Sequence, residues 1–186
     1  VAGSWPCGNA RDRARDLVTQ ILVFSRRAEK EVKPVAVDSL IQETLKLLRA
    51  TLPTTIEIRP QIAIAVDAIL ADPTQIYQIV MNLCTNAAHA MRERGGLIEV
   101  TLGTEEIEPE MLPLYPDLKP GKYVRLSVRD TGTGIPSAVV GRIFDPFFTT
   151  KKREEGTGLG LSVVYGIVKD YGGSITVQSE PGVGST

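Results

Sequence analysis

Two glycine-rich segments are the first features of the sequence that could do chemistry. Residues 130–136 (DTGTGIP) directly follow an expected strand, and residues 156–161 (GTGLGL) directly precede an expected helix. In the first segment, glycines let the backbone approach a flat ligand because no Cβ intervenes, and Asp130 can accept a hydrogen bond from an exocyclic amine such as that of adenine. In the second, the N–H groups and dipole of a helix start attract phosphate. We therefore expect a flat, amine-bearing group at one segment and a phosphate at the other.

A pair of asparagines is the third such feature. Asn82 and Asn86 lie four residues apart in the middle of an expected helix, so both amides project from one face. Asparagine is a poor helix former, and its amide is costly to bury without a partner. Amide oxygens suit a hard cation such as Mg²⁺, which is usually shared with substrate phosphates. The pair therefore indicates a metal or phosphate site.

Each feature also has a plainer interpretation. Residues 130–136 could be an ordinary turn, residues 156–161 a glycine-rich helix entry, and the asparagine pair a capping or packing detail. Two well-known nucleotide-binding signatures do not fit. The dinucleotide-binding signature requires its glycines in a first strand–helix unit with an acidic residue about 20 positions on, and Gly156 does not meet this condition. The second signature, a Walker phosphate loop, is absent. The joint order of the three features is what favours a nucleotide site.

Composition narrows the class of protein. The 186 residues are 42% hydrophobic and 23% charged with a net charge of -1, as in an ordinary globular domain without a global basic field for nucleic acid. Cys7 and Cys84 cannot form a disulfide scaffold, and no apolar run approaches the roughly 18 residues of a spanning helix. The single histidine, His89, excludes a histidine-rich metal centre. We expect a cytoplasmic chain, whether or not a longer protein is anchored in a membrane.

Helices are expected to position two of these features. Residues 1–9 lack periodicity and are expected to be a tag or a disordered end. Residues 10–34 predict an amphipathic helix that Pro34 ends, and Asp38 is placed to cap the next helix. The helix that carries both asparagines is expected to begin at residues 72–73 (DP) and to stop at residues 95–96 (GG).

The other elements alternate between strands and helices without regular βαβ repetition. This order predicts an α+β two-layer sandwich rather than a doubly wound sheet. The expected elements are strands at residues 55–59, 62–66, 97–103, 123–129 and 174–179, a loop at 104–121, a partly helical stretch at 135–144 and a helix at 159–171.

Taken together, these motifs resemble the ATP-binding catalytic domain of sensor histidine kinases, in the GHKL superfamily that also holds gyrase, MutL and heat-shock chaperone ATPases. The resemblance covers about residues 35–186 and implies the Bergerat fold, a mixed sheet on three helices with ATP beneath a lid at about 149–156. The matching segments are 82–86 (N box), 130–136 and 156–161 (glycine boxes) and 144–148 (F box). The ending at 180–186 resembles the segment before a last strand, and we expect the chain to stop before that strand.

The resemblance also implies roles for individual residues. Asp130 would contact the adenine amine, Asn86 would ligate Mg²⁺, and Asn82 would assist with metal or phosphate. Phe144 and Phe147 would anchor the lid, although two aromatics three apart are more often plain core. The other implied nucleotide contacts are Gly132, Gly134 and Ile135 at the base, Gly156, Thr157, Gly158, Leu159, Gly160 and Leu161 at the phosphates, Lys151 of the charged run 151–153, and Ser185.

Asn82 also separates kinases from hydrolases within this superfamily. Hydrolases of the superfamily carry a glutamate one turn before the metal-binding asparagine, where a carboxylate can activate water as a general base. An amide cannot take that proton, so the site favours transfer of phosphate to an external nucleophile. His89 stands where many members have Lys or Arg, and it could bind phosphate weakly or face solvent.

The acceptor histidine of such a kinase is missing from this chain. Residues 10–34 resemble the second helix of the dimerisation hairpin, so the phosphoacceptor helix is expected before residue 1. The implied partners are that helix, a homodimer and a response regulator receiver domain, with no nucleic acid. Two alternatives stay open, an anti-sigma-type serine kinase and a nucleotide-binding scaffold without transfer.

Overall fold

A computed structural model describes residues 31–63, 66–113, 115–150 and 156–186. The chain divides into two units, Val1–Glu31 and Val32–Thr186, of which the second is described here. The expected N-terminal end and most of the expected hairpin helix therefore lie outside the described residues. Lys33–Val35 form strand β1, so the expectation that the helix reaches Pro34 is wrong. In the described part of the chain, no helix is both long and apolar enough to cross a membrane.

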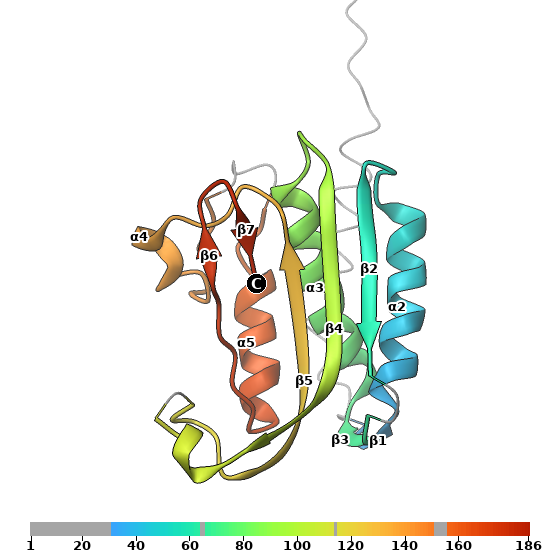
Figure 1. The fold of residues 1–186 in the computed structure, drawn as a ribbon, viewed down its shortest axis with the longest axis vertical. Helices are drawn as coiled ribbons and strands as arrows, with labels where there is room; N and C mark the ends of the chain where they lie inside the picture. Colours follow the sequence, from blue (N-terminus) through green and yellow to red (C-terminus); the bar gives the residue numbers. More distant parts are fainter. Residues whose placement is uncertain (1–30, 64–65, 114, 151–155) are drawn as a thin grey trace, which may run out of the picture. The chain divides into compact units, whose positions relative to one another are not determined.

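The second unit is built on a five-stranded mixed sheet (Figure 1). Its strands, in spatial order, are β2 (Ile56–Ile62), β4 (Gly96–Ile107), β5 (Gly121–Asp130), β7 (Gly184–Ser185) and β6 (Ser179–Glu180). The pair β2 and β4 is parallel, whereas all other neighbours are antiparallel. The long β4–β5 ladder ends with Ile98 opposite Asp130, which places Asp130 at the C-terminal end of β5, where the chain leaves the strand.

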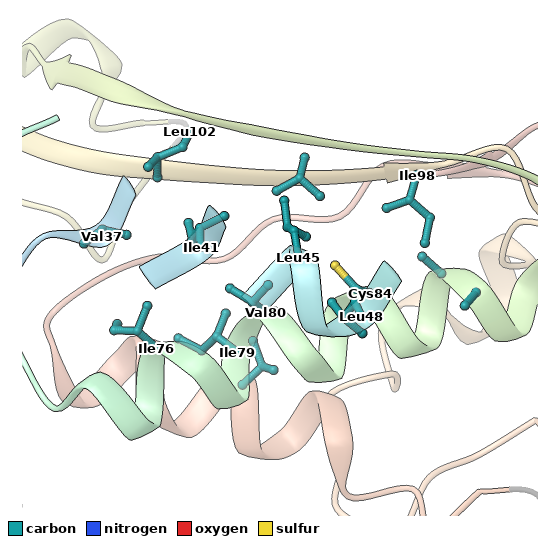
Figure 2. Close-up of a cluster of buried hydrophobic side chains, with 14 of the residues drawn as sticks. Val37, Ile41, Leu45, Leu48, Ile76, Ile79, Val80, Cys84, Ile98 and Leu102 are labelled. Atoms are coloured by element: carbon teal, nitrogen blue, oxygen red, sulfur yellow. The ribbon is translucent and has the colours of Figure 1, made fainter. Parts of the chain in front are cut away.

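Three helices cover one face of this sheet (Figure 1). They are α2 (Val37–Thr51), α3 (Pro73–Ala90) and α5 (Gly160–Asp170). Alternate residues of β4, such as Ile98 and Leu102, point toward Ile41 and Leu45 of α2 and toward α3 (Figure 2). These side chains are buried, and their removal from water supplies the main stabilisation of the unit. The expected α+β two-layer sandwich is confirmed.

Helix α3 begins where the sequence predicts. The Asp72 side chain accepts the N–H of Thr74 at 2.8 Å, and Pro73 occupies the first turn, where a missing N–H costs nothing. The helix ends at Ala90, earlier than the predicted glycine stop, because residues 91–94 form a turn. The predicted cap of α2 is wrong, since Ala36 is the N-cap and Asp38 lies in the first turn.

Several strand predictions are wrong at their boundaries. A single strand, β2, runs through Pro60, because an edge strand is hydrogen-bonded on one side only and tolerates proline. The separate strand expected at 62–66 is therefore not found, and the next described strand is the short β3 (Ile69–Ala71), paired with β1. Strand β4 continues to Ile107, which shortens the expected loop.

The C-terminal hairpin differs most from the sequence prediction. Only Ser179 of the expected strand 174–179 is in a strand, β6. Gly184 and Ser185, which we expected to precede the last strand, already form β7 between β5 and β6. Two further backbone hydrogen bonds link Gln178 and Thr186 at 3.0 and 2.7 Å. Such short strands are fixed by their partners in the sheet and carry little local signal.

The smaller elements lie in connections. A 3₁₀ turn at Pro109–Met111 interrupts the loop between β4 and β5, and the four-residue helix α4 (Ser137–Val140) lies within the partly helical stretch that was predicted. Cys84 of α3 is fully buried, and burial raises the pKa of its thiol to about 12. A thiol in this state is a packing residue rather than a nucleophile.

Candidate functional site

The asparagine pair and the second glycine segment meet in space. Asn82 and Asn86 lie on α3, which packs beside α5. A Cβ added to Gly160 would lie 3.4 Å from Asn82 Oδ1 and 3.7 Å from Asn86 Nδ2. The first residue of α5 therefore faces both amides, and the missing side chain lets the backbone of α5 approach them closely. Two motifs that lie about 70 residues apart in the sequence thus come together at one polar site.

The start of α5 has the properties of an anion site. Its N-cap, Leu159, makes no side-chain capping hydrogen bond to the helix. The first turn of a helix carries N–H groups without intrahelical partners and the positive end of the helix dipole. The Leu159 N–H itself contacts Thr157 Oγ1 at 3.4 Å, a long hydrogen bond. Together with the Asn82 amide oxygen nearby, this end could hold phosphate oxygens and a cation bound to them.

Asp130 provides a buried carboxylate at the end of β5. Its side chain is 8% exposed, and Oδ1 accepts the N–H of Gly132 at 2.8 Å. Burial raises the pKa of Asp130 above its ordinary value, while hydrogen bonds from the backbone N–H groups of Gly132 and Ser185 oppose the rise. The carboxylate is thus held by the backbone as a fixed hydrogen-bond acceptor.

The glycines of residues 130–136 are required by the protein itself. A Cβ on Gly132 would lie 2.7 Å from the Ala90 Cβ, and one on Gly134 would lie 2.1 Å from the Glu180 carbonyl oxygen. Gly134 also has φ +67°, in the left-handed region. The Thr133 N–H donates to the Ala90 carbonyl at 3.1 Å, which ties the loop to the end of α3. The tight approach predicted for a ligand is, in the structure, an approach to α3 and β6.

Helix α3 sets the order of the two ends of the site. Gly132 contacts Ala90, and Gly160 contacts Asn86 and Asn82. These three α3 residues follow at one-turn intervals, which correspond to about 6 Å each along the axis. The carboxylate end and the helix-start end of the site are therefore placed along a single rigid element.

The F box and the second glycine segment are joined through their backbones. The Phe147 N–H donates to the Gly158 carbonyl at 3.0 Å, and a Cβ on Gly158 would lie 2.5 Å from the Phe147 carbonyl carbon. Both residues have positive φ, and Phe147 is the one non-glycine residue in that region among those that the structure describes. A left-handed phenylalanine is strained, so this contact must hold it.

The two F-box phenylalanines lie in different environments. Phe144 is partly buried, with its ring 5.4 Å from that of Tyr165 on α5. Phe147 is 74% exposed, so the plain-core interpretation of the pair is wrong for this residue. Lys151, with the charged run 151–153, lies outside the described residues. His89 lies partly exposed in the last turn of α3.

A serine that the sequence analysis did not identify links the loop at residues 131–136, called the base loop below, to the C-terminal hairpin of β6 and β7. Ser179 Oγ contacts the N–H of Ile135 at 2.7 Å and the Ser185 hydroxyl at 2.9 Å. Both contacted residues were predicted at the nucleotide, whereas Ser179 was not. A single serine in an irregular stretch carries no pattern, so only the three-dimensional pairing of β6 with β7 could have identified it.

Comparison with known proteins agrees with this geometry. Residues 71–186 match the model of a family described as histidine kinase-, DNA gyrase B-, and HSP90-like ATPase. The sensor kinase CckA of Brucella abortus (strain 2308) is 41% identical over 94% of this chain. The chain spans 18% of the length of CckA.

Two solved structures share the fold. One is full-length ShkA in complex with AMPPNP, with a TM-score of 0.69 and 28% identity over 94% of this chain and 34% of that one. The other is histidine kinase ThkA in complex with response regulator protein TrrA, with a TM-score of 0.66 and 28% identity over 95% of this chain and 46% of that one.

Proposed function

The chain belongs to the histidine kinase-, DNA gyrase B- and HSP90-like ATPase family, and on that premise we propose that it is the ATP-binding catalytic part of a two-component sensor histidine kinase. The single observation that carries the proposal is the contact of Asn82 and Asn86 with Gly160 at the start of α5. This arrangement combines a helix start for phosphates with two amide side chains on α3. The solved structures of ShkA with AMPPNP and of ThkA with TrrA support a nucleotide ligand and a response regulator partner.

The carboxylate end of the site would bind the adenine. The Asp130 carboxylate accepts the exocyclic amine, and its backbone partners keep it in place. Gly132 and Gly134 shape the loop on which the base lies, with Ile135 and Ser185 beside it. A preformed acceptor favours binding because little order has to be gained when the base arrives.

The helix-start end would bind the triphosphate and Mg²⁺. The backbone of residues 156–161 would hold phosphate oxygens, with Thr157, Leu159 and Leu161 in this segment. Asn86 would ligate Mg²⁺ through its amide oxygen, and Asn82, whose Oδ1 faces Gly160, would assist with metal or phosphate. When bound, Mg²⁺ would neutralise charge that develops on the phosphate oxygens. Phe144 and Phe147 would anchor the lid, and Lys151 would reach the phosphates.

The chemistry of the pair favours transfer over hydrolysis. In the proposed reaction an imidazole nitrogen uses its lone pair to form a bond to the γ-phosphorus. The bond from that phosphorus to the β–γ bridging oxygen breaks, ADP leaves with the electron pair, and the imidazole N–H proton passes to water. The Asn82 amide takes no proton, so it cannot activate water as a competing nucleophile. The residues named above position ATP for an acceptor outside the chain.

The rest of the kinase would supply the acceptor and the partners. We propose that the unit Val32–Thr186 forms the catalytic domain and that the residues before it, from about residue 10, belong to a dimerisation hairpin whose histidine lies outside this chain. Residues 1–9 would be a tag or a disordered end. The phosphate would pass to a response regulator receiver domain, in the cytoplasm.

A transfer assay tests this function. The chain is mixed with Mg²⁺, γ-labelled ATP and a separately made phosphoacceptor-helix fragment of the longer protein. We expect acid-labile, alkali-stable label on the fragment, which Asn86→Ala abolishes. The matched control is Thr85→Ala, because the exposed Thr85 hydroxyl bonds only to carbonyls of its own helix, at Met81 and Asn82. Acid-stable label would indicate a serine kinase, and nucleotide binding without label would indicate a scaffold.

A further inference from the structure

The Ser179 hydroxyl is the meeting point of three groups at the base end of the site. It accepts the Ile135 N–H at 2.7 Å and donates to the Gly184 carbonyl at 3.0 Å. It also lies 2.9 Å from the Ser185 hydroxyl, and this distance alone does not say which oxygen is the donor. The three contacts connect the base loop, β6 and β7 through one side chain.

The donor of the third contact follows from the valence of a hydroxyl, which has one proton and two lone pairs. The Gly184 carbonyl can only accept, so the proton of Ser179 goes there. The Ile135 N–H can only donate, so it takes one lone pair. The remaining lone pair can only accept a proton from Ser185. All three contacts are satisfied together in this arrangement and in no other.

We propose that Ser179 is a positioning residue that selects 6-amino over 6-oxo purines by fixing the direction of the Ser185 hydroxyl. Ser185 gives its only proton to Ser179, so it presents lone pairs alone to a ligand. Its N–H contacts the Asp130 carboxylate, which is itself an acceptor, and the two residues are paired between β7 and β5. The inference rests on the proposed function, because it concerns the base of the bound nucleotide.

Two acceptors side by side discriminate by chemistry. The amine of adenine offers two N–H donors, one for each acceptor, whereas hypoxanthine presents the lone pairs of its oxo group and only one donor, N1–H. A site of buried acceptors leaves groups unpaired when such a base enters, and this costs binding. Ser179 does not contact the base and acts only through the orientation of the Ser185 hydroxyl.

The test compares two nucleotides that differ at this edge of the base. Dissociation constants of Mg-ATP and Mg-inosine triphosphate are measured by calorimetry for the whole 186-residue chain. In Ser179→Ala, Ser185 regains a free proton and can donate to an oxo group. We expect the preference for ATP over inosine triphosphate to fall about tenfold, the factor of one ordinary hydrogen bond. Ser179→Thr keeps the hydroxyl and is expected to restore the preference of the wild type.

The outcomes separate this inference from the function on which it rests. Equal weakening of both nucleotides by Ser179→Ala, with their ratio unchanged, would mean that Ser179 only supports the loop, and the inference would be overturned. Ser185→Ala provides a second route if Ser179→Ala does not fold, because it removes the oriented acceptor and should lower the ratio similarly. An unchanged ratio in Ser185→Ala also overturns the inference. Failure of the wild type to bind Mg-ATP would instead overturn the proposed function, and this inference with it.

Discussion

The two ends of the candidate site are held in different ways. We call the carboxylate end around Asp130 the base end, and the helix-start end around residues 156–161 the phosphate end. At the base end, Asp130 is buried and accepts backbone N–H groups, and the space beside Gly132 and Gly134 is filled by protein atoms. At the phosphate end, an added Cβ at Gly160 would meet the amides only at ordinary contact distance, and Phe147 is exposed in a strained conformation beside Gly158. The base end is thus closed by packing, whereas at the phosphate end the packing is tight at Gly158 and looser at Gly160.

This difference teaches where binding and folding share residues. A change at the base end should affect the stability of the fold and the affinity for the base together, because the same backbone serves both. A change at Gly160 should affect ligand binding with little effect on stability, whereas Gly158 packs against the Phe147 backbone and does not allow this separation. The largest effect is expected at the base end.

Gly134→Ala should disrupt the base end of the fold. The new Cβ would lie 2.1 Å from the Glu180 carbonyl oxygen, and φ +67° disfavours any L side chain. We expect the free energy of unfolding, measured by urea titration, to fall by about 3 kcal/mol. Gly103→Ala is the matched control, because nothing lies within 4 Å of its added Cβ. Equal stability of the two variants would contradict a base end closed by packing.

Asp130→Asn should remove nucleotide binding. An amide offers one oxygen where the carboxylate offers two, and its NH₂ group cannot accept the N–H groups of Gly132, Ser185 or an adenine. Losing a hydrogen bond to a charged acceptor and mispairing a second group costs about 3 kcal/mol, so Mg-ATP affinity should fall about 100-fold in a titration. Retained affinity would remove Asp130 from the adenine role.

The sequence predicts the phosphate end better than the base end, for a physical reason. Residues 72–73 predict the start of α3, and the four-residue spacing of Asn82 and Asn86 puts both on one face of the helix. Local sequence therefore suffices to predict the position of the asparagine pair. The order of the glycine segments then limits where α5 can begin. The meeting of Gly160 with the asparagines could be expected from this pattern and the resemblance together.

The base end depends on pairings that local sequence does not encode. The short strands β6 and β7 are set by their register, with Ser179 opposite Ser185 and Ser185 opposite Asp130. The strand prediction at 174–179 was therefore wrong, and Ser179 went unnoticed. Similarly, local sequence predicts that Pro60 separates two strands, although proline is tolerated in β2 because this strand lies at the edge of the sheet.

Gly160→Ala should weaken phosphate and metal binding without destabilising the fold. The added Cβ would lie in ordinary contact distance of Asn82 Oδ1, at 3.4 Å, where it would crowd the side of the two amides that faces α5. We expect about tenfold weaker Mg-ATP binding, and stability equal to or above that of the wild type, because alanine favours a helix over glycine by about 1 kcal/mol. Gly166→Ala on the same helix, with nothing within 4 Å, should gain stability and keep its affinity. Equal affinities of the two variants would contradict a phosphate site at Gly160.

The smallest effect should be a pH dependence of stability that comes from Asp130 alone. Burial raises the pKa of Asp130 above its ordinary value of 3.8 despite the opposing backbone hydrogen bonds, so the folded state holds the proton more tightly than the unfolded chain does. The stabilisation is fully present below 3.8 and is lost as the pH rises through the raised pKa. Asp130→Asn does not titrate, so its free energy of unfolding minus that of the wild type should increase as the pH rises above 3.8 and then level off. Urea titrations of both proteins from pH 4 to pH 7 measure this difference, in which every other titrating group cancels. A difference that decreases with pH would mean that the N–H groups of Gly132 and Ser185 outweigh burial, and that the base end favours the charged carboxylate even before a nucleotide binds.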